Sequence, residues 1–251
     1  MSGHSKWSQI KRQKGVADSK RGQLFTKLGR EITISARNGG GGGDPDANFR
    51  LRLAIQKARA ENMPNENIER AIKKGTGGSE AAALEEITYE GYGPGGAAII
   101  VEAMTDNRNR TAAEVRHTFA RNGGALGESG CVAWQFEPKG IILAPFRDDA
   151  EQVALMAIDA GADDVKIEDE SIEVYTVPED IDTVRHALEG NEVAIQSAEV
   201  TMLPTNTMEL GVKEATQTLR LLEKLEDLDE VQRVYTNAVF PAEVAEQHAK
   251  A

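Results

Sequence analysis

The feature that constrains the fold most is an abrupt change of charge near residue 78. Residues 1–78 contain 16 Lys and Arg against 7 Asp and Glu, a net charge of +9, whereas the remaining residues contain 13 against 34, a net charge of −21. The change coincides with Gly75-Thr76-Gly77-Gly78-Ser79, which is typical of a linker. We therefore expect several folding units, the first over residues 1–78, and expect the basic one to contact a polyanion.

The cations are densest at the start of the chain. Six Lys or Arg lie within the first 21 residues, interleaved with Trp7, and Asp18 is the only acid there. Lys and Arg attract phosphate oxygens, and an exposed indole can stack on a base. The alternative is a solvated basic tail, which the opposite charge of the remaining chain disfavours. The predicted nucleic-acid-binding residues are Lys6, Trp7, Lys11, Arg12, Lys14, Lys20, Arg21, Lys27, Arg30 and Arg37.

The apolar spacing within residues 1–78 predicts three helices. The first, over residues 19–37, places its apolar side chains on one arc and its cations on another, and Gly39–Gly43 ends it. No Gly-Lys-Ser/Thr follows these glycines, so they do not indicate a phosphate-binding loop. Asp44 and Pro45 are expected to open the second helix, as N-cap and first residue. The third helix is expected to run from residue 65 to a stop at Gly75.

Beyond residue 78 the periodicity becomes that of strands. Residues 86–92 and 97–104 are expected to pair, and the Gly-x-Gly-x-x-Gly match at Gly91–Gly96 is expected to be their hairpin turn, since a strand and not a helix follows it. Arg108 and Arg110 precede a helix over residues 112–121. They could form a secondary anion site, or serve capping and local ion pairing. Another strand is expected over residues 131–137.

Residues 139–203 have the order β-α-β-β-α-β, which is the ferredoxin-like pattern. A helix over residues 213–225 and a strand over residues 231–234 follow, and they lack partners of their own. We therefore expect them to join the sheet of residues 86–137, with residues 241–251 frayed. The predicted fold class is α+β: a three-helix domain, then an α/β domain of residues 79–138 and 204–251 that carries residues 139–203 as a ferredoxin-like insertion.

The motifs of catalysis are missing from the sequence. The four histidines and Cys131 show no metal-ligand spacing, and no Gly-x-Ser-x-Gly elbow occurs. We expect Cys131 to be a buried small residue, and expect neither an enzyme nor a metal or cofactor site. The chain has no apolar run of membrane-spanning length and begins without a signal-peptide pattern. We therefore expect a cytoplasmic protein with no membrane partner, and the oligomeric state stays open.

Several long segments resemble one family, the YebC/PmpR family of probable transcriptional regulators. The resemblance implies a helical N-terminal domain followed by two α/β domains, one inserted in the other. Family members are described as cytoplasmic DNA-binding regulators, and others, including mitochondrial relatives, as translation factors that act on the ribosome. The matching segments are Gly3–Trp7, Ile10–Lys14, Lys27–Ile32, Asn67–Gly75, Tyr89–Gly96 and Thr105–Thr111.

The charge pattern and the resemblance together leave three hypotheses, in this order. The first is a DNA-binding transcriptional regulator that contacts phosphates through its basic N-terminal domain. The second is a ribosome-associated translation factor that uses the same residues on RNA, with the acidic domains facing basic ribosomal proteins. The third is an enzyme with a site between the two α/β domains.

Overall fold

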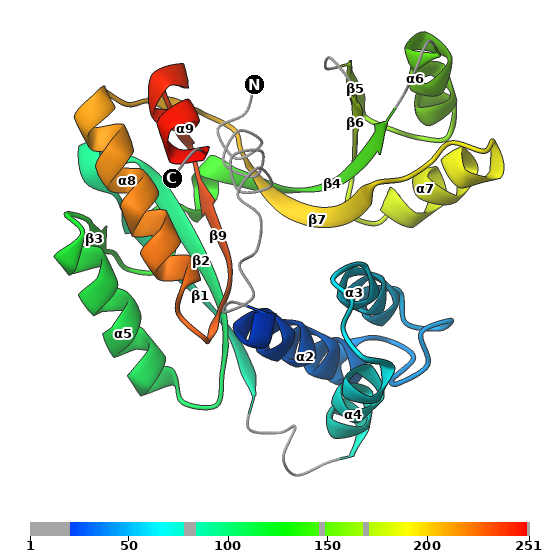
Figure 1. Cartoon of the computed structure of the whole chain (residues 1–251), viewed down its shortest axis with the longest axis horizontal. Helices are drawn as coiled ribbons and strands as arrows, with labels where there is room; N and C mark the ends of the chain where they lie inside the picture. The colour runs from blue at the N-terminus through cyan, green and yellow to red at the C-terminus, as the bar shows by residue number, and fades with distance from the viewer. Residues whose placement is uncertain (1–20, 78–83, 146–148, 168–170, 250–251) are drawn as a thin grey trace. The chain divides into compact units, whose positions relative to one another are not determined.

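The computed structural model describes residues 21–77, 84–145, 149–167 and 171–249. It contains two compact units, residues 1–136 with 204–251, and residues 137–203 (Figure 1). We call them unit 1 and unit 2. The mixed α+β class predicted from the sequence is confirmed, with a helical region first and α/β parts after it.

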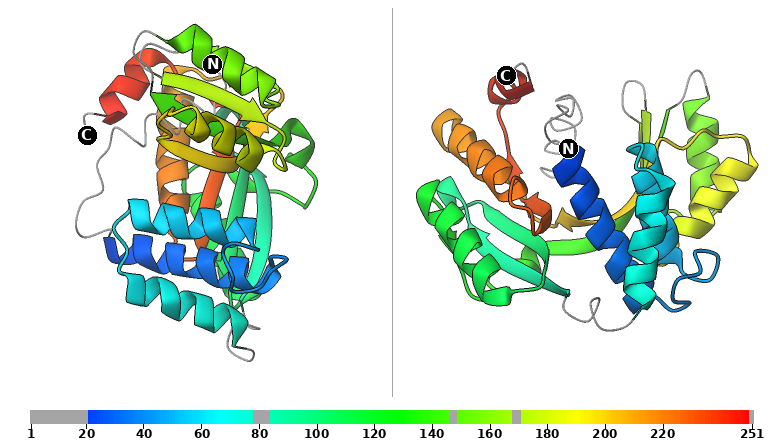
Figure 2. Two further views of the ribbon diagram at one scale, coloured as in Figure 1. Left: turned by 90° about the vertical axis from the view of Figure 1, so that its right-hand side faces the viewer. Right: turned by 60° about the horizontal axis from the view of Figure 1, so that its bottom comes forward.

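The described part of unit 1 begins with three helices, α2 (Arg21–Asn38), α3 (Phe49–Ala60) and α4 (Asn65–Thr76), which lie side by side (Figure 2). Their apolar faces form one buried cluster, as the helical spacing predicts. Thr33 Oγ1 of α2 also donates a hydrogen bond to the carbonyl of Ala71 in α4, at 3.2 Å. The cluster contains Leu28, Ile32, Leu51, Ala54, Ile55, Ala58 and Ile68.

The predicted start of the second helix is wrong. Asp44 and Pro45 lie in turns, and α3 begins at Phe49 with Asn48 as its N-cap. The Asn48 side chain is only 2% exposed; its Oδ1 accepts from the Leu51 amide at 3.0 Å, and its Nδ2 donates to the Ser35 carbonyl at 2.8 Å. Asn48 therefore caps the first turn of α3 and also donates a hydrogen bond to a carbonyl of α2. The Asp44 carboxylate could not do both, because it has no N–H group to donate.

The predicted stop at Gly75 is also wrong. Gly75 lies inside α4, which continues to Thr76, and it is buried against α2. A Cβ atom at this position would lie 2.3 Å from the Thr33 carbonyl oxygen and 2.8 Å from Ala36 Cβ. Glycine is present here because the two helices approach closely, and not because the chain turns.

The α/β part of unit 1 is a four-stranded sheet of order β3-β1-β2-β9. β1 (Glu85–Tyr92) and β2 (Ala98–Thr105) form the predicted antiparallel hairpin, in which Tyr92 faces Ala98. β3 (Ala125–Leu126) and β9 (Val231–Thr236) flank the hairpin, and β9 pairs with β2 as expected. The strand predicted after residue 230 thus returns to this sheet.

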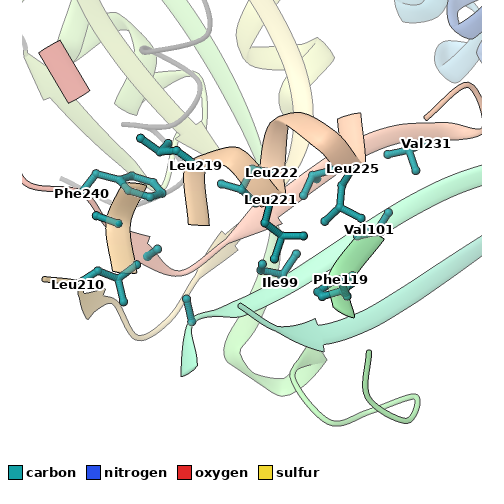
Figure 3. Packing of buried hydrophobic residues seen from close by; sticks show 14 of the residues in the cluster. Ile99, Val101, Phe119, Leu210, Leu219, Leu221, Leu222, Leu225, Val231 and Phe240 are labelled. Carbon is teal, nitrogen blue, oxygen red and sulfur yellow. The ribbon is translucent and has the colours of Figure 1, made fainter. Parts of the chain in front are cut away.

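Two helices cover this sheet, α5 (Arg108–Arg121) and α8 (Val212–Glu226). Ile99 and Val101 of β2 meet Phe119 of α5 and Leu219 and Leu222 of α8 in one apolar cluster (Figure 3). Burying large side chains from three elements at one place supplies the main stabilisation of this part of the unit.

The prediction that residues 241–251 are frayed is wrong for residues 242–249, which form a helix. A short parallel pair, β8 (Met208–Glu209) and β10 (Ala238–Val239), leads into α9 (Ala242–Ala249). Val244 of α9 is 4% exposed and belongs to the same apolar cluster. The prediction missed this helix because its apolar contacts with the cluster, at Val244 and Ala245, are adjacent and give almost no periodic signal.

The strand predicted over residues 131–137 is wrong in its first half. Residues 133–135 form a 3₁₀ turn, and β4 (Phe136–Pro145) begins only at Phe136. The Glu90 carboxylate accepts hydrogen bonds from the amides of Gly130, Val132 and Ala133, at 2.6, 2.8 and 2.7 Å. Burial opposes the ionised form, but these three bonds outweigh it and lower the pKa of Glu90. Amides bonded to a carboxylate cannot join a strand ladder.

Unit 2 has the predicted ferredoxin-like topology. Its sheet has the order β5-β6-β4-β7, with β5 (Asp164–Ile167), β6 (Ser171–Thr176) and β7 (Ser197–Pro204). β4 pairs antiparallel with β6, and β6 with β5. Helices α6 (Ala150–Asp159) and α7 (Ile181–Gly190) complete the order β-α-β-β-α-β, and they contact each other.

Candidate nucleic-acid interface

Six of the ten predicted nucleic-acid-binding residues lie outside the described residues. They are Lys6, Trp7, Lys11, Arg12, Lys14 and Lys20. Their role stays a prediction based on charge and composition.

Two of the four remaining cations bind within the chain. Lys27 Nζ donates a hydrogen bond to the carbonyl of Glu226, and Arg30 Nη1 donates to the carbonyl of Asp229. These acceptors belong to the acidic turn between α8 and β9, residues 226–230. Both cations are half-buried there. The positive arc of α2 therefore docks on an acidic segment some 200 residues later in the chain.

Glu31 reinforces the same junction. Its Oε1 lies 2.9 Å from Arg233 Nη2 of β9, and its Oε2 lies 3.1 Å from Lys57 Nζ of α3. Burial alone would raise the pKa of Glu31, but the charges of Lys57 and Arg233 outweigh it and lower the pKa to about 2. This carboxylate joins α2, α3 and the sheet.

Two arginines of α3 are likewise engaged. Arg50 makes a two-pronged ion pair with Glu86 of β1. Arg52 lies over the ring of Phe49, 5.8 Å from its centroid, and donates to the carbonyl of Pro45 at 3.1 Å. Both guanidinium groups therefore already have partners within the chain, which makes them less available to bind phosphate.

The exposed positive charge of the three-helix part lies mainly on α4 and the end of α3. The four exposed cations there make no ion pair with any residue that the structure describes; they are Arg59, Arg70, Lys73 and Lys74. Arg21 is exposed at the start of α2, and at its other end Arg37 Nε donates to Asn38 Oδ1 at 3.1 Å. The predicted list of binding residues contains none of these four cations; for Arg70 and Lys73, a position on the side of α4 away from Ile68 and Ala71 was the available signal.

Arg108 and Arg110 are both paired. Arg108 Nε lies 3.5 Å from Glu85, and Arg110 Nη2 lies 2.7 Å from both Asp106 Oδ1 and Glu230 Oε1. Asn107 caps α5, because its Oδ1 accepts from the Arg110 amide at 3.1 Å. These contacts are the ones expected if this segment serves helix capping and local ion pairing. An anion site at Arg108 and Arg110 stays a prediction.

Trp134 is the aromatic residue that sequence reasoning misplaced. A strand over residues 131–137 would place Trp134 and Phe136 on the same face, because they are two residues apart, but Phe136 is 7% exposed and Trp134 is 70% exposed. Trp134 Nε1 and Tyr92 Oη both donate to the carbonyl of Cys131, at 3.1 and 3.0 Å. The indole is thus held in place with most of its surface in solvent.

Among the described residues, the one cysteine is not an activated thiol and no cluster of potential metal ligands occurs. Cys131 is half-buried, and burial followed by the nearby Glu90 charge raises the pKa of its thiol, which keeps it protonated. Within residues 21–249 as far as they are described, no group of three His, Cys, Asp or Glu side chains is arranged to hold a metal ion. In the same residues no helix combines the length and apolarity needed to cross a bilayer.

Comparison with known proteins gives matches over nearly the whole chain. Residues 5–78 match the TACO1/YebC protein N-terminal domain, and residues 84–238 match the TACO1/YebC second and third domain. A probable transcriptional regulatory protein of Moorella thermoacetica is 57% identical over 251 residues, covering 98% of this chain and 99% of that one. One of Chloroflexus aurantiacus is 58% identical, covering 97% and 98%.

A solved structure has the same fold. The crystal structure of a conserved hypothetical protein from Aquifex aeolicus superposes with a TM-score of 0.80 at 47% sequence identity. The match covers 89% of this chain and 92% of that one.

Proposed function

Because the chain belongs to the TACO1/YebC family, we propose that it is a regulatory protein that binds nucleic acid, in the first place DNA, through its basic N-terminal domain. The observation that carries the proposal is the charge division, +9 for residues 1–78 against −21 for the remainder. The names of its relatives, probable transcriptional regulatory proteins, support it. A polyanion is attracted to the basic part and repelled by the acidic part.

The contacts are expected to be mainly with phosphates. Lys27 and Arg30 are engaged with carbonyls inside the chain, so the binding charge comes from the segment before α2 together with the exposed cations of α3 and α4. The exposed cations of α4 share the helix with the exposed acids Glu66 and Glu69, which is unlike a recognition helix that reads base edges. We therefore expect modest sequence specificity.

The ribosome is the second candidate partner. The net charge of −21 beyond residue 78 favours it, because an acidic part of that size is repelled by naked DNA but is attracted to basic ribosomal proteins. In this alternative the same N-terminal cations contact ribosomal RNA.

The test is a titration of the full-length protein with a short DNA duplex and, separately, with purified ribosomes, at several salt concentrations. Replacing Lys11, Arg12 and Lys14 with Ala is expected to weaken binding and to reduce the slope of log K against log salt by about 0.9 for each phosphate that is no longer neutralised. The charge-preserving control Lys11→Arg, Arg12→Lys, Lys14→Arg is expected to bind like the wild type.

The outcomes separate the candidates. Preference for the duplex, with weaker binding by the alanine variant, supports the DNA regulator. Preference for ribosomes with the same weakening supports the translational alternative. Unchanged affinity of the alanine variant for both partners would refute the N-terminal contact.

A further inference from the structure

The exposed charged residues on the outer surface of α5 and α8 are cationic, whereas the sequence around these helices is acidic. Residues 79–251 carry a net charge of −21, yet no Asp or Glu is exposed on either helix. The four acids that the two helices contain are all half-buried; they are Glu114, Glu214, Glu223 and Glu226. The exposed charged residues of both helices are cationic.

The helical repeat places these residues opposite the core. In α8, Lys213, Gln217, Arg220 and Lys224 follow one another at spacings of four, three and four, on the side away from the buried Leu222. In α5, His117 and Arg121 lie on the side away from the buried Val115 and Phe119, and the exposed Arg116 lies at the edge of that side.

The two faces belong to one layer. α5 and α8 contact each other, and both bury their apolar sides in the cluster above β2 (Figure 3). Their outward faces therefore adjoin (Figure 1). We call the surface that they form the α5–α8 surface; its residues are Arg116, His117, Arg121, Lys213, Arg220 and Lys224.

The charges of this surface are largely uncompensated. Lys224 Nζ lies 3.4 Å from Asp227, and its side chain is still 63% exposed. Four of its residues make no ion pair within the part of the chain that the structure describes; they are Arg116, Arg121, Lys213 and Arg220. By contrast, Arg108 and Arg110 at the start of α5 are paired with acids. The exposed charges of this surface are of one sign, and such a surface attracts a polyanion.

We propose that the α5–α8 surface binds the phosphate backbone of nucleic acid, as a second contact separate from the basic N-terminal domain. The proposal rests on the proposed function and extends it from one binding surface to two. A charged lipid surface is the less suitable partner, because a helix lying on a membrane needs large apolar residues beside its cations. Between the cations stand Ala113, Ala120 and Gln217, and the one large exposed apolar residue of these two helices, Val212, lies at the end of α8.

The experiment compares two variants of equal net charge in the full-length protein. The test variant is Arg116→Gln, Arg121→Gln, Arg220→Gln. The matched control is Gln152→Glu, Ala194→Glu, Gln196→Glu, which lowers the charge equally at exposed positions of unit 2. Each is titrated against the DNA duplex and against ribosomes at several salt concentrations, after thermal unfolding confirms that both fold.

We expect the test variant to bind the preferred partner at least roughly tenfold more weakly than the control at about 0.1 M salt. Its salt slope should also be smaller, by about 0.9 for each phosphate that the removed arginines had neutralised. The variant Arg116→Lys, Arg121→Lys, Arg220→Lys is expected to restore binding, because phosphate contact needs the charge.

Equal affinities of test variant and control would overturn the inference. If the Lys11, Arg12 and Lys14 alanine variant still binds more weakly in that case, the proposed function stands and only the second surface fails. If the wild type binds neither partner, the proposed function fails as well. A larger weakening on anionic phospholipid vesicles than on nucleic acid would overturn the choice of partner.

Discussion

At the scale of single residues, three buried polar side chains hold segments that are distant in sequence. Asn48 joins α2 to α3, Glu90 fixes the loop of residues 130–133, and Glu31 joins α2 to Lys57 and Arg233. Each is fully engaged, so that removing one partner leaves a buried charge or donor unsatisfied. Such groups should contribute more to stability than exposed ion pairs do.

Glu31 gives a testable dependence on pH. Its pKa is lowered from 4.5 in the unfolded chain to about 2 in the folded protein, so its contribution is complete above pH 4.5 and is lost as the pH falls through about 2. We expect Glu31→Gln to lower the unfolding free energy by about 2–3 kcal/mol at neutral pH. Between pH 4.5 and about 2 the variant should lose less stability than the wild type, as urea titrations at several pH values will measure.

Glu61→Gln, at an exposed position of the same helical part, is the control and should leave the pH profile unchanged. Identical profiles for the wild type and Glu31→Gln would contradict the assignment.

The sequence predicted which residues are buried better than it predicted what the cations contact. Leu51, Ala54, Ile55 and Ala58 are buried as the helical spacing predicts, since periodicity is local. Ala47, predicted on the same inner face, is exposed because it precedes α3. The partners of Lys27 and Arg30 lie 199 residues away, and helical spacing contains no information about them. A cationic arc was therefore interpreted as open when part of it is docked.

At the scale of secondary-structure elements, the order of helices and strands was predictable and several ends were not. The β-α-β-β-α-β order was sufficient to predict the sheet of unit 2. The helix start predicted at Asp44, the helix stop predicted at Gly75 and the strand start predicted at Cys131 are wrong for one reason. In each case a contact with another element determines the local conformation, and the local sequence does not reveal that contact. Trp134 was misplaced for the same reason.

Gly75 allows this cause to be tested. We expect Gly75→Ala to destabilise the protein by about 1–3 kcal/mol, because the added methyl would overlap the Thr33 carbonyl, although alanine favours helices. The matched control is Gly29→Ala in α2, where the nearest atom, Met63 Cε, would lie 3.9 Å away. That variant should be unchanged, or more stable by up to about 1 kcal/mol. Urea unfolding measures both, and a Gly75→Ala protein as stable as the wild type would refute close helix packing here.

At the scale of the whole molecule, the two units have separate cores. Ile142 of β4 is fully buried in unit 2, and Leu222 of α8 is fully buried in the cluster of unit 1. We expect scanning calorimetry to resolve two unfolding transitions. Ile142→Ala should lower the midpoint of one transition and Leu222→Ala that of the other, each by a destabilisation of about 2–5 kcal/mol. A single transition that both substitutions shift equally would show that the units unfold together.

The chain leaves unit 1 and returns to it at one point. The Thr205 amide donates to the carbonyl of Gln135 at 2.8 Å, and Thr205 Oγ1 donates to the same oxygen at 3.1 Å, so the two ends of residues 137–203 are held next to each other. A change in the length of that segment can therefore leave the backbone of unit 1 in place. A force that pulls the two ends of unit 2 apart therefore loads the two hydrogen bonds between Gln135 and Thr205 first.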